Sequence, residues 1–198
     1  MAMTTEAPTA LVVSEQTYDA YMAEPEVQGR YDIVNGVRIF MSGASLRHQR
    51  IADCIARFLY AFEQKSGLGI SVSAPYDVLI KRFPRIQTRQ PDVLFVSHAR
   101  MAQSAGDPEV GPLEVAPELV VEVISNSGTQ RILGDKIADY ISIGADECWV
   151  VRPADRTVEV LTLTLNGAQS VAIYDEGQTV SSIVFPGLTV SVADVLAA

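Results

Sequence analysis

The stretch APELVVEVISNSGTQRILGDKIADYISIGADECWVV, residues 116–151, predicts a strand, a turn, a helix and a second strand in succession. Its two apolar runs, 118–124 and 147–151, are continuous rather than alternating, which is typical of strands buried on both faces. Between them, Leu133, Ile137 and Ile141 form one apolar stripe at helical spacing. This alternation of strands and helices predicts an α/β fold with a mixed sheet.

The rest of the chain extends this alternation in both directions. Asn35-Gly36 and Asn166-Gly167 each stand between two runs rich in β-formers, which is the strongest short-range signal for a hairpin. Residues 97–118 lack periodicity and predict a long surface loop. The other predicted elements are a short helix over 14–22 capped by Ser14, a hairpin over 30–41, a long helix from Ser45 to Gly67, strands over 70–81 and 91–96, a hairpin over 157–174, and short strands over 179–185 and 188–196.

The size and composition of the chain restrict its class. At 198 residues it fits one domain, which we expect over 14–198 after a flexible N-terminus at 1–13. A formal net charge of -9 argues against a protein that coats DNA without specificity, because phosphate binding depends largely on Lys and Arg. Cys54 and Cys148 stand far apart, so neither a disulfide framework nor a zinc cluster is indicated. The lack of a membrane-length apolar run or a recognisable secretion signal predicts a soluble cytoplasmic protein.

Two carboxylates fall within apolar strands. Glu122 stands between Val121 and Val123, where an ionised carboxylate needs a cationic partner or a metal to offset its desolvation. Asp92 opens a second apolar strand directly after Pro91. If the two strands are neighbours in register, the two acids can share a hard divalent cation, which prefers oxygen ligands.

Other polar residues are candidates for the same site. Lys136, on the helix after Glu122, can lean back toward the strand and stabilise negative charge in phosphoryl transfer. His48 faces inward near the start of the long helix, where it could contact a phosphate or carry a proton. Asp32 and Asp77 could face the same cavity.

Each of these residues also has a purely structural interpretation. Glu122 could pair with an internal Lys or Arg, and Asp92 could be a strand-entry residue. Lys136 could be a solvated surface lysine, and His48 a core or capping histidine. The other two acids, taken singly, are more typical of structural roles.

A local basic stretch precedes Asp92. It consists of Lys81, Arg82, Arg85 and Arg89, with no acid between them. Such a run is usually a solvated loop. Beside a metal site it could instead supply the local positive field that the whole chain lacks, and it is the candidate contact for a substrate backbone.

Three segments together resemble a known family. They are RYDIVNGV (30–37), QPDVLFV (90–96) and the stretch 116–151, whose order and spacing are similar to the Uma family of restriction-endonuclease-like proteins over most of the chain. The resemblance implies the PD-(D/E)XK nuclease fold, an α/β fold in which helices flank a mixed β-sheet. One hairpin near the N-terminus and a C-terminal β-hairpin would be additions to that fold.

The same resemblance implies a metal site. In that superfamily the acids of the PD and (D/E)XK motifs bind magnesium, and Asp92 and Glu122 occupy those positions here. The implied metal-binding residues are Asp92, Glu122 and Val123, with Mg²⁺ or Mn²⁺ as the cofactor. The motif lysine would fall at Ile124, so Lys136 on the next helix is its implied replacement.

These observations support one main function and two alternatives. The main hypothesis is a metal-dependent endonuclease acting on DNA, whose catalytic residues would be Asp92, Glu122, Lys136, His48 and Asp32, the last two matching a histidine and an acid that recur in the family. The first alternative is a homodimeric binding or assembly module that keeps the nuclease fold without catalysis. The second is a serine hydrolase, which lacks support because no G-x-S-x-G turn is present.

Overall fold

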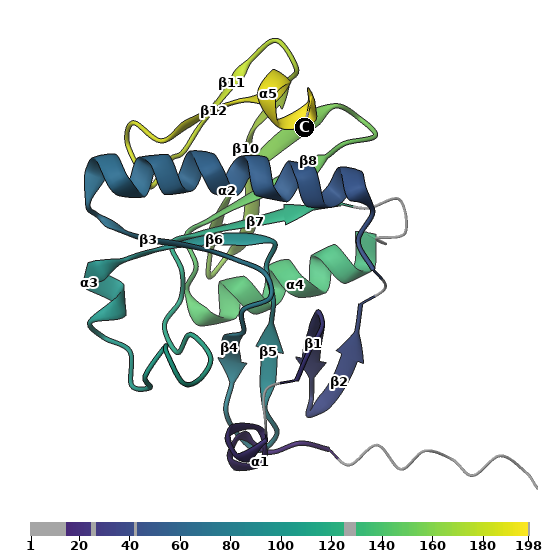
Figure 1. Ribbon diagram of the computed structural model, residues 1–198, viewed down its shortest axis with the longest axis vertical. Coiled ribbons are helices and arrows are strands. Elements are labelled where there is room, and N and C mark those ends of the chain that lie inside the picture. Colours follow the sequence, from purple (N-terminus) through teal and green to yellow (C-terminus); the bar gives the residue numbers. More distant parts are fainter. Residues whose placement is uncertain (1–14, 25–26, 42, 125–129, 198) are drawn as a thin grey trace, which may run out of the picture.

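A computed structural model describes residues 15–24, 27–41, 43–124 and 130–197 of the chain (Figure 1). The larger of its sheets contains, in spatial order, β10 (Gly167–Asp175), β9 (Thr157–Thr164), β8 (Glu147–Arg152), β7 (Leu119–Val123), β6 (Val93–Ser97) and β3 (Gly69–Ser73). β7 and β8 run parallel, whereas the other neighbouring pairs of this sheet run antiparallel. The sheet is therefore mixed, as predicted, and the two apolar runs of 116–151 lie at its centre.

A long helix lies on each face of this sheet. α4 (Gln130–Ile143) stands between β7 and β8 in the sequence and packs on one face, while α2 (Leu46–Ser66) crosses the opposite face (Figure 1). A short helix, α3 (His98–Met101), follows β6 at the start of the predicted loop. Because both faces are covered, β7 and β8 need apolar residues on both sides, which explains their continuous apolar character.

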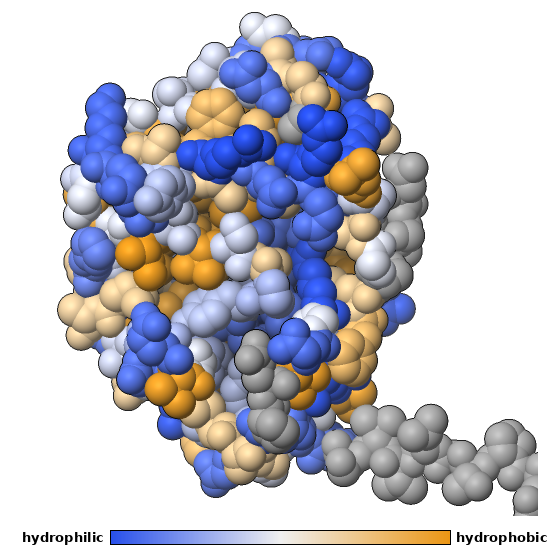
Figure 2. All heavy atoms as spheres, viewed as in Figure 1, coloured by the Kyte–Doolittle hydropathy of each residue, from blue (hydrophilic) through white to orange (hydrophobic). Residues whose placement is uncertain are grey.

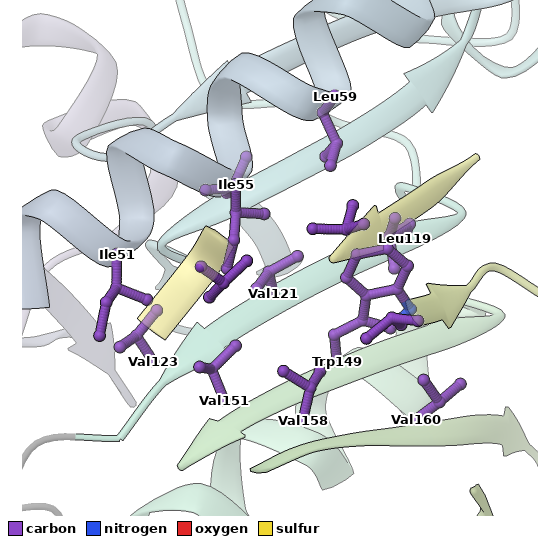
Figure 3. Close-up of a cluster of buried hydrophobic side chains, with 14 of the residues drawn as sticks. Ile51, Ile55, Leu59, Leu119, Val121, Val123, Trp149, Val151, Val158 and Val160 are labelled. Carbon is purple, nitrogen blue, oxygen red and sulfur yellow. The ribbon is translucent and has the colours of Figure 1, made fainter. Parts of the chain in front are cut away.

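The packing of α2 positions the start of that helix over the sheet. Its N-terminal cap is Ser45, whose hydroxyl accepts from the backbone N–H of His48 at 3.2 Å, and its C-terminal cap is Gly67 at a φ of 62°. Side chains on its inner face point into a buried cluster with β7, β8 and β9 (Figure 3). The labelled members of this cluster are Ile51, Ile55, Leu59, Leu119, Val121, Val123, Trp149, Val151, Val158 and Val160.

A second sheet lies beside the start of β6. Its order is β2 (Val37–Phe40), β1 (Tyr31–Val34), β5 (Gln87–Arg89) and β4 (Val78–Lys81), and α1 (Tyr18–Ala23) lies against it. The β1–β2 hairpin turns at Asn35-Gly36 with φ values of 50° and 80°, as the sequence predicts. A Cβ on Gly36 would lie 2.8 Å from the backbone nitrogen of Gln16, so glycine is required there for space as well as for conformation.

The C-terminal segment contributes to the same buried cluster as α2. β11 (Thr179–Ser181) and β12 (Thr189–Ser191) form a two-stranded sheet, and α5 (Val192–Ala197) follows directly. The sequence predicted a strand over 188–196, which is wrong for its second half. Val192, Val195 and Leu196 are buried at helical spacing, whereas Leu188, Val190 and Val192 alternate as in a strand, so the period of the apolar residues changes at Val192.

Two further predictions about strands are wrong. The single strand predicted over 70–81 is two strands, β3 and β4, which belong to different sheets. The chain leaves the first sheet around Pro75, which has no N–H to donate to a ladder. β5 was not predicted, because three residues in a polar, basic stretch carry no strand signal.

Some expectations cannot be placed. The flexible N-terminus at 1–13, the capping role of Ser14 and the turn at 125–129 lie outside the described residues, and the cap of α1 is Thr17 instead, whose side chain accepts from the N–H of Ala20. Within the described ranges, no helix is long and apolar enough to cross a membrane.

Candidate active site

Asp92 and Glu122 lie at the end of the central sheet where β6 begins and β7 ends. The two strands pair with Val93 opposite Val121, so the next position of the register sets Asp92 opposite Glu122. The backbone N–H of Asp92 donates to the carbonyl of Val121 at 3.1 Å, and the N–H of Val123 donates to Asp92 Oδ2 at 2.6 Å. The Asp92 side chain thus supplies the acceptor for the last rung of this ladder, and the two acids are neighbours as predicted.

Glu122 is held by two residues of α4. Lys136 Nζ donates to both carboxylate oxygens, at 2.9 and 2.8 Å, and the Tyr140 hydroxyl donates to Oε1 at 2.5 Å. Lys136 and Tyr140 are four residues apart, so they project from the same face of the helix. All three side chains are buried, so Lys136 leans toward the strand and is not a surface lysine.

Burial and charge set the protonation of this group. Burial raises the pKa of the Glu122 carboxyl above its ordinary value, Lys136 opposes that rise, and the nearby Asp92 carboxylate adds to it. Burial alone would lower the pKa of Lys136, but the surrounding carboxylates, Glu122 above all, together hold that pKa above its ordinary value. Lys136 therefore keeps its positive charge beside the two acids.

Asp92 is surrounded by donors from three elements. Its Oδ1 forms an ion pair with Arg30 Nη1, just before β1, and lies 3.0 Å from His48 Nε2 on α2. Burial would raise the pKa of Asp92, but the hydrogen bond from His48 and the charge of Arg30 outweigh it, so this pKa lies below its ordinary value. Asp92 therefore keeps its negative charge at neutral pH.

The described contacts do not use every acceptor position of the two carboxylates. Each carboxylate oxygen can accept two hydrogen bonds. Among the described contacts, Oδ1 of Asp92 and Oε1 of Glu122 each have two neighbours, whereas Oδ2 and Oε2 each have one. The contacts of the described residues thus leave one acceptor position on each acid, and carboxylate oxygens are the donors that Mg²⁺ and Mn²⁺ prefer.

Beyond Asp92 and Glu122, the described His, Cys, Asp and Glu side chains would not supply further ligands to such an ion. Within the described ranges, no group of three or more His, Cys, Asp and Glu side chains is arranged to hold a metal. Mg²⁺ commonly keeps several waters and uses only one or two carboxylates. The donor set of Asp92 and Glu122 therefore fits a hydrated Mg²⁺ better than a fully protein-bound ion.

Asp32 contacts neighbours of Asp92 and not the two carboxylates of Asp92 and Glu122 themselves. Its carboxylate accepts from Arg89 Nη1 at 2.9 Å and from the backbone N–H of Gln90 at 3.0 Å. Gln90 in turn accepts from Arg30 Nη2 at its carbonyl, at 3.1 Å. Asp32 thus supports the strand that carries Asp92 and the arginine that contacts it.

The basic stretch before Asp92 is paired internally. Arg89 is buried between Asp32 and Asp139 of α4, at 2.9 and 2.6 Å, and this burial contradicts its predicted contact with a substrate. The other three residues lie on the second sheet and its loop. Lys81 donates to Asn35 Oδ1, Arg82 pairs with Glu114, and Arg85 pairs with Glu15, so their contact with DNA stays a prediction.

Asp77 does not share this site. It is buried under the second sheet, where it accepts from the hydroxyls of Tyr21, Tyr31 and Thr88 at 2.7, 3.1 and 3.0 Å. Burial raises the pKa of Asp77, and its hydrogen-bonding partners oppose that rise. The prediction that Asp77 faces the same cavity is therefore wrong, and its contacts join α1 to the sheet.

Comparison with known proteins decides the family. The sequence matches the model of Uma2, a family described as "Putative restriction endonuclease", over residues 16–193. The chain belongs to the Uma2 family. The predicted family is thereby confirmed. No curated protein matches the sequence.

A solved structure has the same fold as this Uma2 chain. It is the crystal structure of a "putative nuclease belonging to DUF820" from Anabaena variabilis, with a TM-score of 0.72 and 16% sequence identity. The similarity covers 91% of this chain and 97% of that chain. At this identity the likeness shows the fold, and it confirms the predicted α/β class with helices on a mixed sheet.

The sequence missed two residues of the site in this Uma2 protein. Arg30 begins the hairpin predicted over 30–41, and nothing around it in the sequence indicates that its side chain pairs with Asp92. Tyr140 continues the apolar stripe of α4, and its hydroxyl could have drawn attention because a buried tyrosine needs an acceptor.

Proposed function

We propose that this Uma2 protein is a metal-dependent endonuclease that hydrolyses phosphodiester bonds in DNA. The observation that carries this proposal is the pair of buried carboxylates, Asp92 and Glu122, at opposed positions of two neighbouring strands, with Lys136 directly on Glu122. Two adjacent acids are costly to bury together, and a shared cation offsets that cost. The family to which the chain belongs supports the same chemistry.

The metal would be held by Asp92 and Glu122, with Val123 as the third predicted position. When bound, Mg²⁺ or Mn²⁺ lowers the pKa of a water ligand and neutralises charge on a phosphate. Val123 already contacts this group through its N–H, which donates to Asp92. Oδ2 and Oε2, which each accept one hydrogen bond from the described residues, are the positions proposed for the ion.

Lys136 and His48 have separate roles in this proposal. An ammonium group has three donors, and the described contacts of Lys136 use two, so the third can stabilise the charge that develops on a reacting phosphate. His48 orients Asp92 through Nε2, and its Nδ1 is buried with no partner within the described residues. With Nε2 donating to Asp92, Nδ1 of a neutral imidazole is an acceptor, and a metal-bound water could donate to it.

A nicking assay tests the proposal. Supercoiled plasmid and single-stranded DNA are incubated with the purified protein and Mg²⁺ or Mn²⁺, and with EDTA. We expect metal-dependent cleavage that Glu122→Gln abolishes, while Glu159→Gln, a change in a partly buried surface ion pair, leaves it intact. Cleavage that persists in EDTA or in Glu122→Gln, or no cleavage by the wild type, would contradict the proposal.

One observation favours a binding module as the second candidate. Arg30 and Lys136 already neutralise the two carboxylates, so the fold has no need of a metal for charge balance. Such a module could form a homodimer at the outer edge of β10, where Val171 and Ile173 are 54% and 59% exposed. Calorimetric titration with Mn²⁺ distinguishes the two candidates, because absence of binding at millimolar metal supports the module.

A further inference from the structure

The cations around the two acids differ in their access to solvent. The Arg30 side chain is 20% exposed, whereas those of Lys136 and Arg89 are 6% and 8% exposed. In the same view as Figure 1, hydrophilic side chains continue across the molecular surface between α2 and the β1–β2 hairpin (Figure 2). Of these three cations, Arg30 is therefore the one that a ligand from solution can reach.

The hydrogen-bonding groups of Arg30 are only partly used. Nη1 pairs with Asp92 and lies 3.3 Å from His48 Nε2, and Nη2 donates to the carbonyl of Gln90 at 3.1 Å. Nε is buried and has no partner within the described residues. A buried N–H without an acceptor is unfavourable, and a guanidinium presents its donors as a fork that matches phosphate oxygens. An anionic ligand could accept the hydrogen bond for which the described residues offer no acceptor.

Metal binding would change the position of Arg30. The carboxylates of Asp92 and Glu122 are balanced by Arg30 and Lys136, so a divalent ion on Asp92 adds two positive charges beside the guanidinium. Repulsion between them favours separation of Arg30 from Asp92. Lys136 cannot move away in the same way, because it is buried on the inner face of α4 and donates to both oxygens of Glu122.

We propose that Arg30 is the phosphate ligand of this site, and that in the free protein it occupies Asp92 as a counter-ion which the metal displaces toward the substrate. This inference rests on the proposed function. It predicts that the Arg30 side chain has opposite effects on the affinity for metal and on the affinity for DNA. Arg30 should weaken metal binding in the absence of DNA, because it competes for Asp92, and it should strengthen DNA binding once the metal is present.

The test measures both affinities in Arg30→Gln. Calorimetry gives the affinity for Mn²⁺ without DNA, and fluorescence anisotropy gives the affinity for a short labelled duplex in Ca²⁺, with gels to check that the duplex stays intact. We expect Mn²⁺ to bind at least about threefold more tightly, and the duplex about tenfold more weakly, than in the wild type. Arg38→Gln is the matched control, since Arg38 lies in the same hairpin but pairs with Glu24, and it should change neither affinity.

A second variant and a melting curve keep the test decisive if Arg30→Gln is unstable. Arg30→Lys keeps the charge but lacks the fork, so its affinity for Mn²⁺ should stay within about twofold of wild type while the duplex binds more weakly. Weaker Mn²⁺ binding by a folded Arg30→Gln, or unchanged duplex binding by both variants, would overturn the assignment of Arg30. A wild type that binds no Mn²⁺ and cleaves no DNA would instead overturn the proposed function, and this inference with it.

Discussion

Glu122 and Lys136 form an ion pair with almost no contact with solvent, and each charge depends on the other. Removing one partner of a buried pair leaves an uncompensated charge, which costs about 3–5 kcal/mol of stability. Lys136→Met should therefore destabilise the fold by about that amount near neutral pH. The double variant Glu122→Gln/Lys136→Met should be less destabilised than Lys136→Met alone, as measured by urea unfolding. A double variant as unstable as the sum of both changes would contradict the pairing.

The pH dependence of Lys136→Met follows from the same pair. Burial raises the pKa of Glu122 in the folded state above its unfolded value, and loss of Lys136 raises it further. Between the unfolded pKa and the folded pKa of Glu122, the folded state binds more protons than the unfolded state, so stability falls as the pH rises. We expect Lys136→Met to lose more stability at about pH 8 than at about pH 5, relative to wild type. Equal losses in unfolding curves at both pH values would show that Glu122 does not titrate.

Tyr140→Phe tests the other donor to Glu122. The change removes the hydroxyl while keeping the ring, so the pKa of Glu122 should rise further. If Glu122 must be ionised to hold the metal, activity is lost as the pH falls through this pKa. The acidic limb of the pH–rate profile should then shift to higher pH in Tyr140→Phe but not in Tyr76→Phe, whose hydroxyl donates to Pro108 away from the site. An unshifted limb in Tyr140→Phe would exclude Glu122 as the titrating group.

How far the sequence predicts this site depends on the surroundings of each residue. Asp92 and Glu122 could be found because an acid inside an apolar strand must have a partner. Lys136 could be found because it lies on the helix predicted directly after the strand of Glu122. Arg30 could not be found, because its partner lies in a strand about sixty positions away and no local pattern relates the two. The role predicted for Arg89 failed because a run of basic residues does not show which acids fold back onto it.

At the scale of elements, Glu147 attaches the C-terminal segment to the central sheet. This fully buried carboxylate of β8 accepts from the Ser182 hydroxyl at 2.8 Å and from the N–H groups of Ile183 and Val184 at 2.9 and 3.0 Å. Glu147→Ala leaves these donors unsatisfied and should cost about 3 kcal/mol or more in urea unfolding. Glu159→Ala in the neighbouring strand should cost less than about 1 kcal/mol, since its ion pair is partly exposed. Similar losses in both variants would contradict this anchoring role.

Elements were predictable where one period dominated the sequence. α2 has a cap, an apolar face and a C-terminal glycine, and the structure has all three. α5 was predicted as part of a strand because Leu188, Val190 and Val192 alternate at its start, although Val192, Val195 and Leu196 have the spacing of a helix. β5 was not predicted because its three residues form a strand only through pairing with β1 and β4, which the local sequence does not indicate.

At the scale of the whole molecule, the net charge is -9, and Arg82, Arg85 and Arg89 of the basic stretch are paired with acids. The salt dependence of DNA binding reports how many phosphates are neutralised, with a log–log slope of about -0.9 for each. We expect a slope no steeper than about -3 for duplex binding in Ca²⁺, measured by anisotropy across a range of NaCl concentrations. A slope of about -6 or steeper would reveal a basic surface that the structure does not show.

A manganese-soaked crystal tests the metal site most directly. Anomalous scattering locates Mn²⁺ independently of catalysis and of any bound DNA. The proposed site predicts a peak in contact with the carboxylates of Asp92 and Glu122, with Arg30 moved off Asp92, and loss of that peak in Glu122→Gln. At millimolar Mn²⁺, a structure with no anomalous density between these two acids, and with the Arg30–Asp92 pair intact, would contradict it.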